Sequence, residues 1–207
     1  MKILIASHNA GKVEEFKALL GNSGYEIESL LDYPDIEEVA ETGTTFEENA
    51  RLKAETIAQR LHQVVIADDS GLMVDALAGA PGVYSARYSG EPKDDDRNNQ
   101  KLLRELAEIE PGQRTARFVS CIVAAYPGYE SLVVEGQVEG TILNQPQGES
   151  GFGYDPLFYY PEQDSTFAQM ALAEKNKISH RAKAFEKLQE AFAKWLEGLN
   201  DEISSDE

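Results

Sequence analysis

Basic residues stand at two places where helices are expected to begin. Lys12 comes soon after the short apolar strand predicted over residues 2–6, and His180 and Arg181 follow Ser179, a suitable N-cap for the last helix. The first turn of a helix favours acidic side chains, by about 0.3–1 kcal/mol, so a cation there is best explained by a nearby anion. Because backbone N–H groups at a helix start bind phosphate, the two positions indicate a phosphate site.

Either position alone is equally well explained by an exposed, flexible side chain. Together, in a chain with 19 basic and 37 acidic residues, they favour an anion site. Lys53 and Lys175 are further candidate ligands, although Lys53 by itself has the pattern of an ordinary exposed helix lysine.

Two adjacent carboxylates, Asp68 and Asp69, close a short apolar run that predicts a buried strand. Working side chains of α/β folds lie at such strand ends. Adjacent strand residues face opposite ways, so one carboxylate is expected to enter a site and the other to cap a turn at Ser70. Glu41 offers a second hard oxygen ligand. A polyphosphate among so many acidic groups predicts Mg²⁺, which takes one or two carboxylates plus phosphates and waters. The alternative is that the Asp-Asp pair is only a common turn sequence.

Other chemistries lack their motifs. The sequence has neither the GxxxxGK[ST] loop of P-loop enzymes nor the GxGxxG pattern of dinucleotide-binding folds, and no Cys/His spacing suggests zinc. Phe152 and Tyr154 lie in a glycine-rich turn and can stack on a base, although aromatic residues next to strands are more often part of the core.

Composition limits the classes of partner. The 207 residues carry a net charge of −18, which argues against nucleic acid and against anionic membranes as partners. No run approaches the roughly 20 apolar residues that span a bilayer. The single cysteine excludes a disulfide framework and fits a reducing compartment, so we expect a cytoplasmic location.

Apolar spacing predicts the elements that position these residues. Helical periodicity follows the first strand, recurs after Thr45, where Glu48 completes a capping box, and is clearest from Phe185 to Leu199. Strands and helices alternate in a way that predicts an α/β fold with a mixed sheet. We expect a single domain over residues 1–199, followed by an acidic, disordered tail over residues 200–207.

Five blocks of sequence resemble a known family in their order and content. They are SHNAGKVEEF, ETGTTFEENARLKA, ADDSGLMVDALAGAPGVYSARYSG, GFGYDPLF and EKNKISHRAKA. The chain resembles the inosine/xanthosine triphosphate pyrophosphatases from about Lys2 to Leu196. This resemblance implies a mixed, twisted central sheet flanked by helices, with two lobes and a cleft between them.

The resemblance also implies roles for individual residues. Asp69 is the implied proton acceptor and a Mg²⁺ ligand, and Glu41 is a second metal ligand. His8 occupies a position that varies in the family, so no chemistry is attached to it. The implied substrate-binding residues, for the phosphates and the nucleobase, are Ser7, His8, Asn9, Ala10, Gly11, Lys12, Lys53, Ser70, Phe152, Gly153, Tyr154, Asp155, Lys175, His180 and Arg181.

The activity implied by the resemblance is hydrolysis of ITP, dITP or XTP to the monophosphate and pyrophosphate, by a homodimer. Arg181, or backbone N–H groups near Phe152, would donate to the 6-keto oxygen of the base. Either Asp69 or the metal would activate the attacking water. The alternatives are a related pyrophosphatase for pyrimidine or modified nucleotides, a non-catalytic nucleotide sensor, and an acidic scaffold protein.

Overall fold

The structure, a computed structural model, describes residues 2–20 and 24–205. Its strands are β1 Lys2–Ile5, β2 Glu26–Ser29, β3 Val65–Val74, β4 Thr115–Ala125, β5 Leu132–Ile142, β6 Phe158–Tyr160 and β7 Ser165–Thr166. Its α-helices are α1 Ala10–Leu20, α2 Phe46–Leu61, α3 Asp95–Glu105, α4 Leu172–Ile178 and α5 His180–Ser205. Short 3₁₀ helices lie at Leu30–Asp32, Asp75–Leu77, Gly82–Arg87, Pro111–Gln113, Pro161–Gln163 and Phe167–Gln169.

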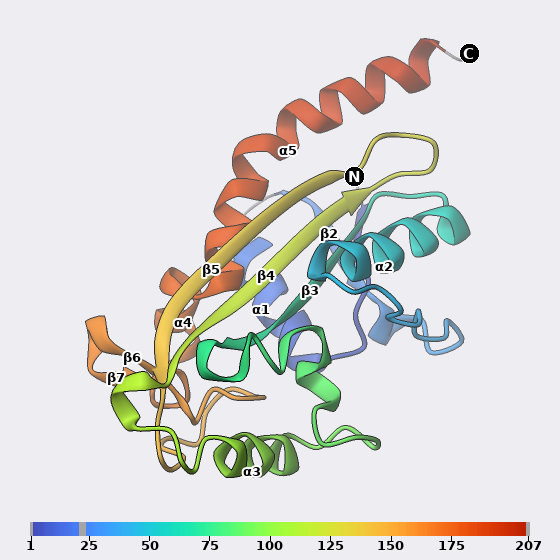
Figure 1. Cartoon of the computed structure of the whole chain (residues 1–207). Coiled ribbons are helices and arrows are strands. Elements are labelled where there is room, and N and C mark those ends of the chain that lie inside the picture. Colours follow the sequence, from blue (N-terminus) through green and yellow to red (C-terminus); the bar gives the residue numbers. More distant parts are fainter. Residues whose placement is uncertain (1, 21–23, 206–207) are drawn as a thin grey trace. The chain divides into compact units, whose positions relative to one another are not determined.

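The strands form one mixed sheet in the order β2-β1-β3-β4-β5-β6-β7 (Figure 1). β1 runs parallel to both β2 and β3, and Leu4 is paired with Val65 and Ile5 with Ile66. β6 is antiparallel to β5 and to β7. The α/β fold with a mixed sheet is therefore confirmed.

The chain divides into two compact units, each assembled from separate segments. Unit 1 comprises Met1–Asp69, Cys121–Gly136 and Ala182–Glu207, and unit 2 comprises Ser70–Ser120 and Gln137–Arg181. The single domain over residues 1–199 and the cleft between lobes stay predictions.

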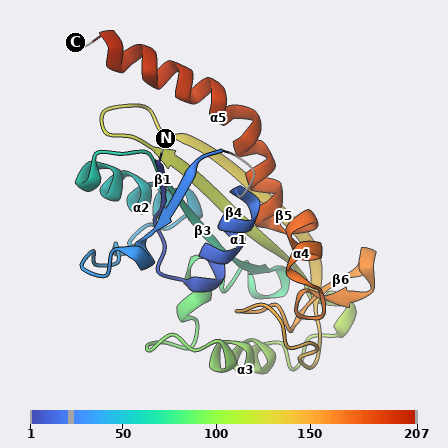
Figure 2. The ribbon, with the colours of Figure 1, turned by 180° about the vertical axis from the view of Figure 1, so that it is seen from behind.

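Unit 1 has apolar cores on both faces of its part of the sheet. On one face, Ile3, Ile5 and Ile66 pack with residues of α1 and α5, including Phe16, Phe185 and Leu188. Figure 2 shows the ribbons of these two helices from this side. On the other face, Leu4, Val65 and Ala67 pack with Ala54, Ile57 and Ala58 of α2. A strand covered on both faces has no solvent side, which is why residues 64–67 are continuously apolar.

Unit 2 has an aromatic core. The ring centroid of Phe118 lies 4.6 Å from that of Phe158, which lies 4.9 Å from that of Phe167. Leu72 and Val74 are buried in the same core. Strand β3 continues to Val74, and these two alternate residues face the same core. The prediction that this strand ends in two carboxylates was therefore wrong.

Helix α5 is longer than the apolar pattern first indicated. It continues to Ser205 and so includes residues 200–205, which the sequence analysis assigned to a disordered tail. Leu196 and Leu199 are buried in the unit 1 core, and Ile203 repeats their spacing one turn later. The last two residues of the predicted tail, 206 and 207, lie outside the described residues.

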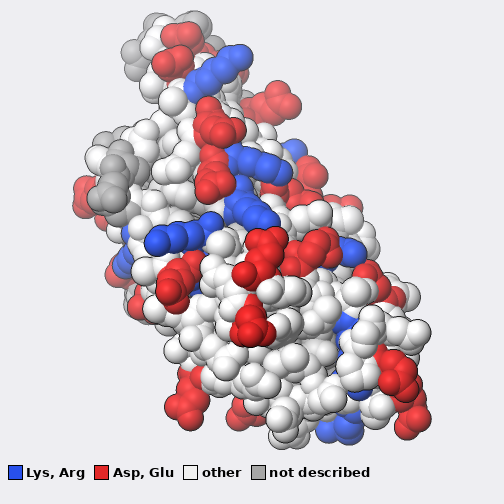
Figure 3. Space-filling view, turned by 90° about the vertical axis from the view of Figure 1, so that its left-hand side faces the viewer, with Lys and Arg blue, Asp and Glu red and all other residues white. Residues whose placement is uncertain are grey.

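Acidic and basic side chains are interspersed among uncharged residues on the face shown in Figure 3. Among the described helices, none is both long and apolar enough to cross a bilayer.

The predicted capping box of α2 is confirmed. The hydroxyl of Thr45 accepts a hydrogen bond from the Glu48 backbone N–H at 3.1 Å. Because an N-cap side chain typically contributes about 1 kcal/mol, Thr45→Ala should lower the free energy of unfolding by that amount, measured by urea denaturation. Thr45→Ser keeps the hydroxyl and is the matched control. Equal stability of the alanine and serine variants would contradict the role of the cap.

Candidate active site

The two carboxylates of β3 face opposite sides of the sheet, as predicted. Asp68 Oδ1 lies 3.0 Å from Lys12 Nζ of α1, and Asp69 Oδ1 lies 3.2 Å from Lys53 Nζ of α2. The expectation that the carboxylate outside the site caps a turn at Ser70 was wrong, because β3 continues through that residue. Each carboxylate instead has a lysine on its own side of the strand.

Lys53 joins two acidic residues that are far apart in the sequence. Its Nζ donates to Glu41 Oε1 at 2.9 Å and to Asp69 Oδ1 at 3.2 Å. The lysine is only 8% exposed and Asp69 only 4%. It is therefore not the exposed helix lysine of the alternative interpretation, and the two buried residues form one acid–base cluster with the half-buried Glu41.

Burial and charge oppose each other in this cluster. Burial raises the pKa of Asp69, and the ammonium groups of Lys53 and Lys12 offset this only in part. For Lys53, burial alone would lower the pKa, but the carboxylates of Asp69 and Glu41 outweigh it and the pKa is raised. Lys53 therefore stays protonated, and Asp69 holds a proton more readily than an exposed aspartate does.

The first sequence block forms the start of α1. The hydroxyl of Ser7 accepts a hydrogen bond from the Asn9 N–H, and the Asn9 side-chain oxygen accepts one from the Lys12 N–H, each at 3.1 Å. Asn9 thus caps the helix and places Lys12 in its first turn. Ala10 and Gly11 form that turn, and His8 is half-buried beside it. The first turn has no acidic residue, which suits an anion.

Unit 2 holds a second cluster of predicted site residues. Lys175 Nζ lies 2.7 Å from Asp155 Oδ2, and both side chains are almost completely buried. The same carboxylate oxygen accepts the Phe152 N–H at 3.1 Å. Lys175 Nζ also lies 5.0 Å from the centre of the Phe152 ring, within range of a cation–π interaction. The ion pair therefore holds the turn that carries the aromatic ring.

Arg181 and His180, at the start of α5, are also buried. The Arg181 guanidinium donates to the Ser70 hydroxyl at 3.0 Å and lies 5.9 Å from the centre of the Phe152 ring. The His180 ring stacks on the Phe118 ring, with 4.8 Å between the ring centroids. With only 1% of its surface exposed, Arg181 cannot be an isolated surface charge.

Residues of α3, which the sequence analysis did not single out, hold the glycine of this turn. The Gly153 N–H donates to Asp95 at 2.7 Å, and the Gly153 carbonyl accepts from the Asn99 side chain at 2.9 Å. The Tyr154 hydroxyl donates to the Ser85 carbonyl at 2.8 Å. Tyr154 is thus a buried core residue, in line with the alternative interpretation of the aromatic pair.

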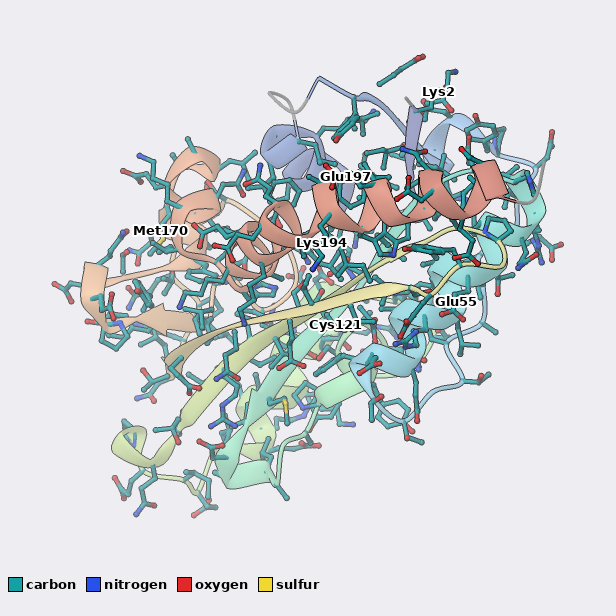
Figure 4. All side chains as sticks on the ribbon, turned by 90° about the horizontal axis from the view of Figure 1, so that it is seen from above. Lys2, Glu55, Cys121, Met170, Lys194 and Glu197 are labelled. Atoms are coloured by element: carbon teal, nitrogen blue, oxygen red, sulfur yellow. The ribbon has the colours of Figure 1, made fainter. Side chains whose placement is uncertain are left out.

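The single cysteine is buried, away from solvent. Cys121, labelled on β4 in Figure 4, lies in the core beneath α2. Burial raises the pKa of its thiol to about 12, so the nucleophilic thiolate is essentially absent at neutral pH.

A family model described as the Ham1 family matches residues 3–191. The chain belongs to the Ham1 family. A dITP/XTP pyrophosphatase from Geobacillus kaustophilus is 57% identical over 197 residues, which cover 95% of this chain and 97% of that protein. Membership confirms the resemblance inferred from the five sequence blocks.

Solved Ham1 structures share the fold. The Staphylococcus aureus Ham1 protein is 47% identical with a TM-score of 0.82, and the match covers 94% of this chain and 98% of that one. A HAM1 protein from Coxiella burnetii is 37% identical with a TM-score of 0.84, covering 94% and 99%.

In this Ham1-family protein the predicted residues fall into two groups. Lys12, Lys53, Glu41 and Asp69 belong to unit 1, whereas Ser70 and the residues from Phe152 to Arg181 belong to unit 2. Their convergence on one nucleotide stays a prediction.

Asn49, whose amide donates to Asp69 at 3.1 Å, was not predicted from the sequence. Its signal was a polar residue on the apolar face of α2, one turn before Lys53.

The buried Lys175–Asp155 pair gives a test of structure in unit 2. Removing one partner leaves a buried charge without its counter-ion, so Lys175→Met should lower the free energy of unfolding by about 3–5 kcal/mol. Lys177→Met, at an exposed position of the same helix, should change it by less than about 0.5 kcal/mol. Denaturant unfolding measures both, and similar losses for the two variants would contradict the structural role of the pair.

Proposed function

We propose that this protein hydrolyses non-standard purine nucleoside triphosphates, dITP and XTP above all, to the monophosphate and pyrophosphate. The observation that carries the proposal is the cluster of Lys53, Glu41 and Asp69, in a chain 57% identical to a dITP/XTP pyrophosphatase. The cluster supplies the charges that such a reaction needs.

The proposed reaction is an attack of water on the α-phosphorus. A bond forms between the water oxygen and phosphorus, and the bond from that phosphorus to the bridging oxygen breaks, so pyrophosphate leaves. Asp69 accepts the proton that the water loses. The pKa of this buried carboxyl is raised from the ordinary value, which makes it a better proton acceptor than an exposed aspartate.

Basic residues of unit 1 bind and orient the triphosphate in this proposal. Lys12 lies in the first turn of α1, where backbone N–H groups add to its charge. Lys53 lies beside Asp69 and compensates negative charge that develops as the leaving group departs. Phosphoryl transfer depends mainly on such positioning and charge compensation, so the protein needs no covalent intermediate.

The acidic residues fit a Mg²⁺ ion, which we propose as the cofactor. Glu41 Oε1 and Asp69 Oδ1 lie 2.9 and 3.2 Å from Lys53 Nζ, so both carboxylates face one cation, which is the lysine in this structure. No group of three or more His, Cys, Asp or Glu side chains forms a metal cage in the part of the chain that the structure describes. Mg²⁺ suits such a donor set, because phosphates and waters complete its coordination. When bound, it would neutralise phosphate charge.

Unit 2 supplies the proposed base-recognition residues. Inosine and xanthosine carry a 6-keto oxygen, an acceptor, where adenine carries an amino donor. Arg181, buried near Phe152, would donate to this oxygen. Against adenine that donor would stay unpaired, and sites of this kind discriminate by a factor of about 10⁴ or more.

A homodimer and a cytoplasmic location complete the proposal. The homodimer derives from the family resemblance, and the location is inferred from the lone cysteine. Sedimentation of the purified chain tests the homodimer.

A nucleotide panel tests the activity. With dITP, XTP, dATP, dGTP and dCTP, and with or without EDTA, we expect pyrophosphate release from dITP and XTP that EDTA abolishes. Release of phosphate alone would contradict the reaction type. Preference for dCTP would favour the pyrimidine enzyme, and tight binding of dITP without turnover would favour a sensor.

Asp69→Asn tests the proton acceptor within that reaction. The amide keeps the shape of the side chain but cannot accept the proton, so kcat should fall by about 10²–10⁴-fold while dITP still binds. Single-turnover kinetics and calorimetry measure the two quantities. A kcat near that of the unchanged protein would remove Asp69 from the mechanism.

A further inference from the structure

One buried amide links the two acidic elements of the candidate site. Asn49 of α2 has no exposed surface. Its side-chain nitrogen donates to Asp69 Oδ2 at 3.1 Å, and its side-chain oxygen accepts the Gly43 N–H at 2.8 Å. Gly43 lies two residues after Glu41. A single side chain thus contacts both the β3 carboxylate and the backbone of the loop that carries the other acid.

The loop is packed closely against this amide. A β-carbon on Gly43 would lie 2.8 Å from Asn49 Oδ1 and 2.6 Å from Glu48 Cβ, distances at which the neighbours must move. The Glu48 carboxylate also accepts the Thr44 N–H at 2.6 Å. The first turn of α2 therefore fixes the path of the chain after Glu41.

We propose that Asn49 is a positioning residue, which holds the Asp69 carboxylate in place and ties it to the loop of Glu41. This inference rests on the proposed function, because it assigns a purpose to the spacing of the two acids. Lys53 bonds one oxygen of Asp69 and Asn49 bonds the other, so the orientation of the carboxylate is determined by two donors from successive turns of α2.

An amide suits this position for a physical reason. It presents one acceptor and one donor group on a short stem. The acceptor oxygen faces the Gly43 N–H, and the donor nitrogen faces the Asp69 carboxylate. Alanine removes both bonds. Aspartate, of the same shape, keeps an acceptor for Gly43 but places a second carboxylate against Asp69. The two substitutions therefore separate the link to the loop from the link to the catalytic acid.

The chain offers a matched control in Asn98 of α3. This asparagine is 2% exposed, accepts the Ser89 N–H at 2.7 Å and donates to the Ala86 carbonyl at 3.0 Å. It makes the same two kinds of bond, but its amide donates to a carbonyl and not to a carboxylate. Asn98→Ala therefore reproduces the loss of a buried amide without touching the acids.

The experiment compares Asn49→Ala, Asn49→Asp and Asn98→Ala by steady-state kinetics with dITP, thermal unfolding and amide hydrogen exchange. We expect both Asn49 variants to lose kcat by about 10- to 100-fold with KM changed less than about 3-fold, as for residues that orient a ligand or acid. Asn98→Ala should lose comparable thermal stability with kcat within about 3-fold. Exchange at the Gly43 N–H should accelerate at least about 10-fold in Asn49→Ala and stay slow in Asn49→Asp.

The inference is overturned if folded Asn49 variants keep kcat within about 3-fold, or if Asn98→Ala loses activity in proportion to stability. Should neither Asn49 variant fold, Gly43→Ala decides, because its methyl group displaces the loop while Asn49 remains; an unchanged kcat there overturns the inference. Absence of turnover by the unchanged protein would instead contradict the proposed function. The hydrogen-exchange rates at the Gly43 N–H test the link to the loop even then, because they do not depend on turnover.

Discussion

The candidate site depends on charge compensation in a buried place. Asp69 lies inside unit 1, where an unpaired carboxylate would be strongly unfavourable, and Lys53 supplies the compensating cation. The carboxylates of Asp69 and Glu41 both raise the pKa of the lysine, against the effect of burial. Strand β3, helix α2 and the loop before it must therefore fold together, because each contributes one charge to the cluster.

Unit 2 also contains a buried acid that is compensated by a lysine. Lys175 and Asp155 form a buried ion pair, and the carboxylate also holds the backbone of the turn at Phe152. In both units a lysine on a helix neutralises a buried acid. Charged residues in this strongly acidic chain are thus part of the scaffold as well as candidate ligands.

The sequence predicted the fold class and offered candidate site residues, because the signals for both are local. Apolar periodicity marks the faces of α1 and α2, and the capping box at Thr45 needs only four residues. The pairing of Lys53 with Glu41, the link made by Asn49 and the support of Gly153 by α3 were not predicted. Each joins segments through tertiary packing, and periodicity contains no information on which polar residues then meet. The continuation of β3 was missed because Ser70 and Gly71 have the composition of a turn, whereas Leu72 and Val74 override it by burial.

The opposite orientation of Asp68 and Asp69 makes the register of β3 decisive. Its pairing with β1, Leu4 opposite Val65 and Ile5 opposite Ile66, determines which carboxylate faces which helix. A slip of one residue would exchange the two acids between the faces and present each lysine with the wrong partner. An insertion or deletion of a single residue within the strand ahead of Asp68 would therefore disrupt both ion pairs, whereas one in the connection before β3 would leave the register intact.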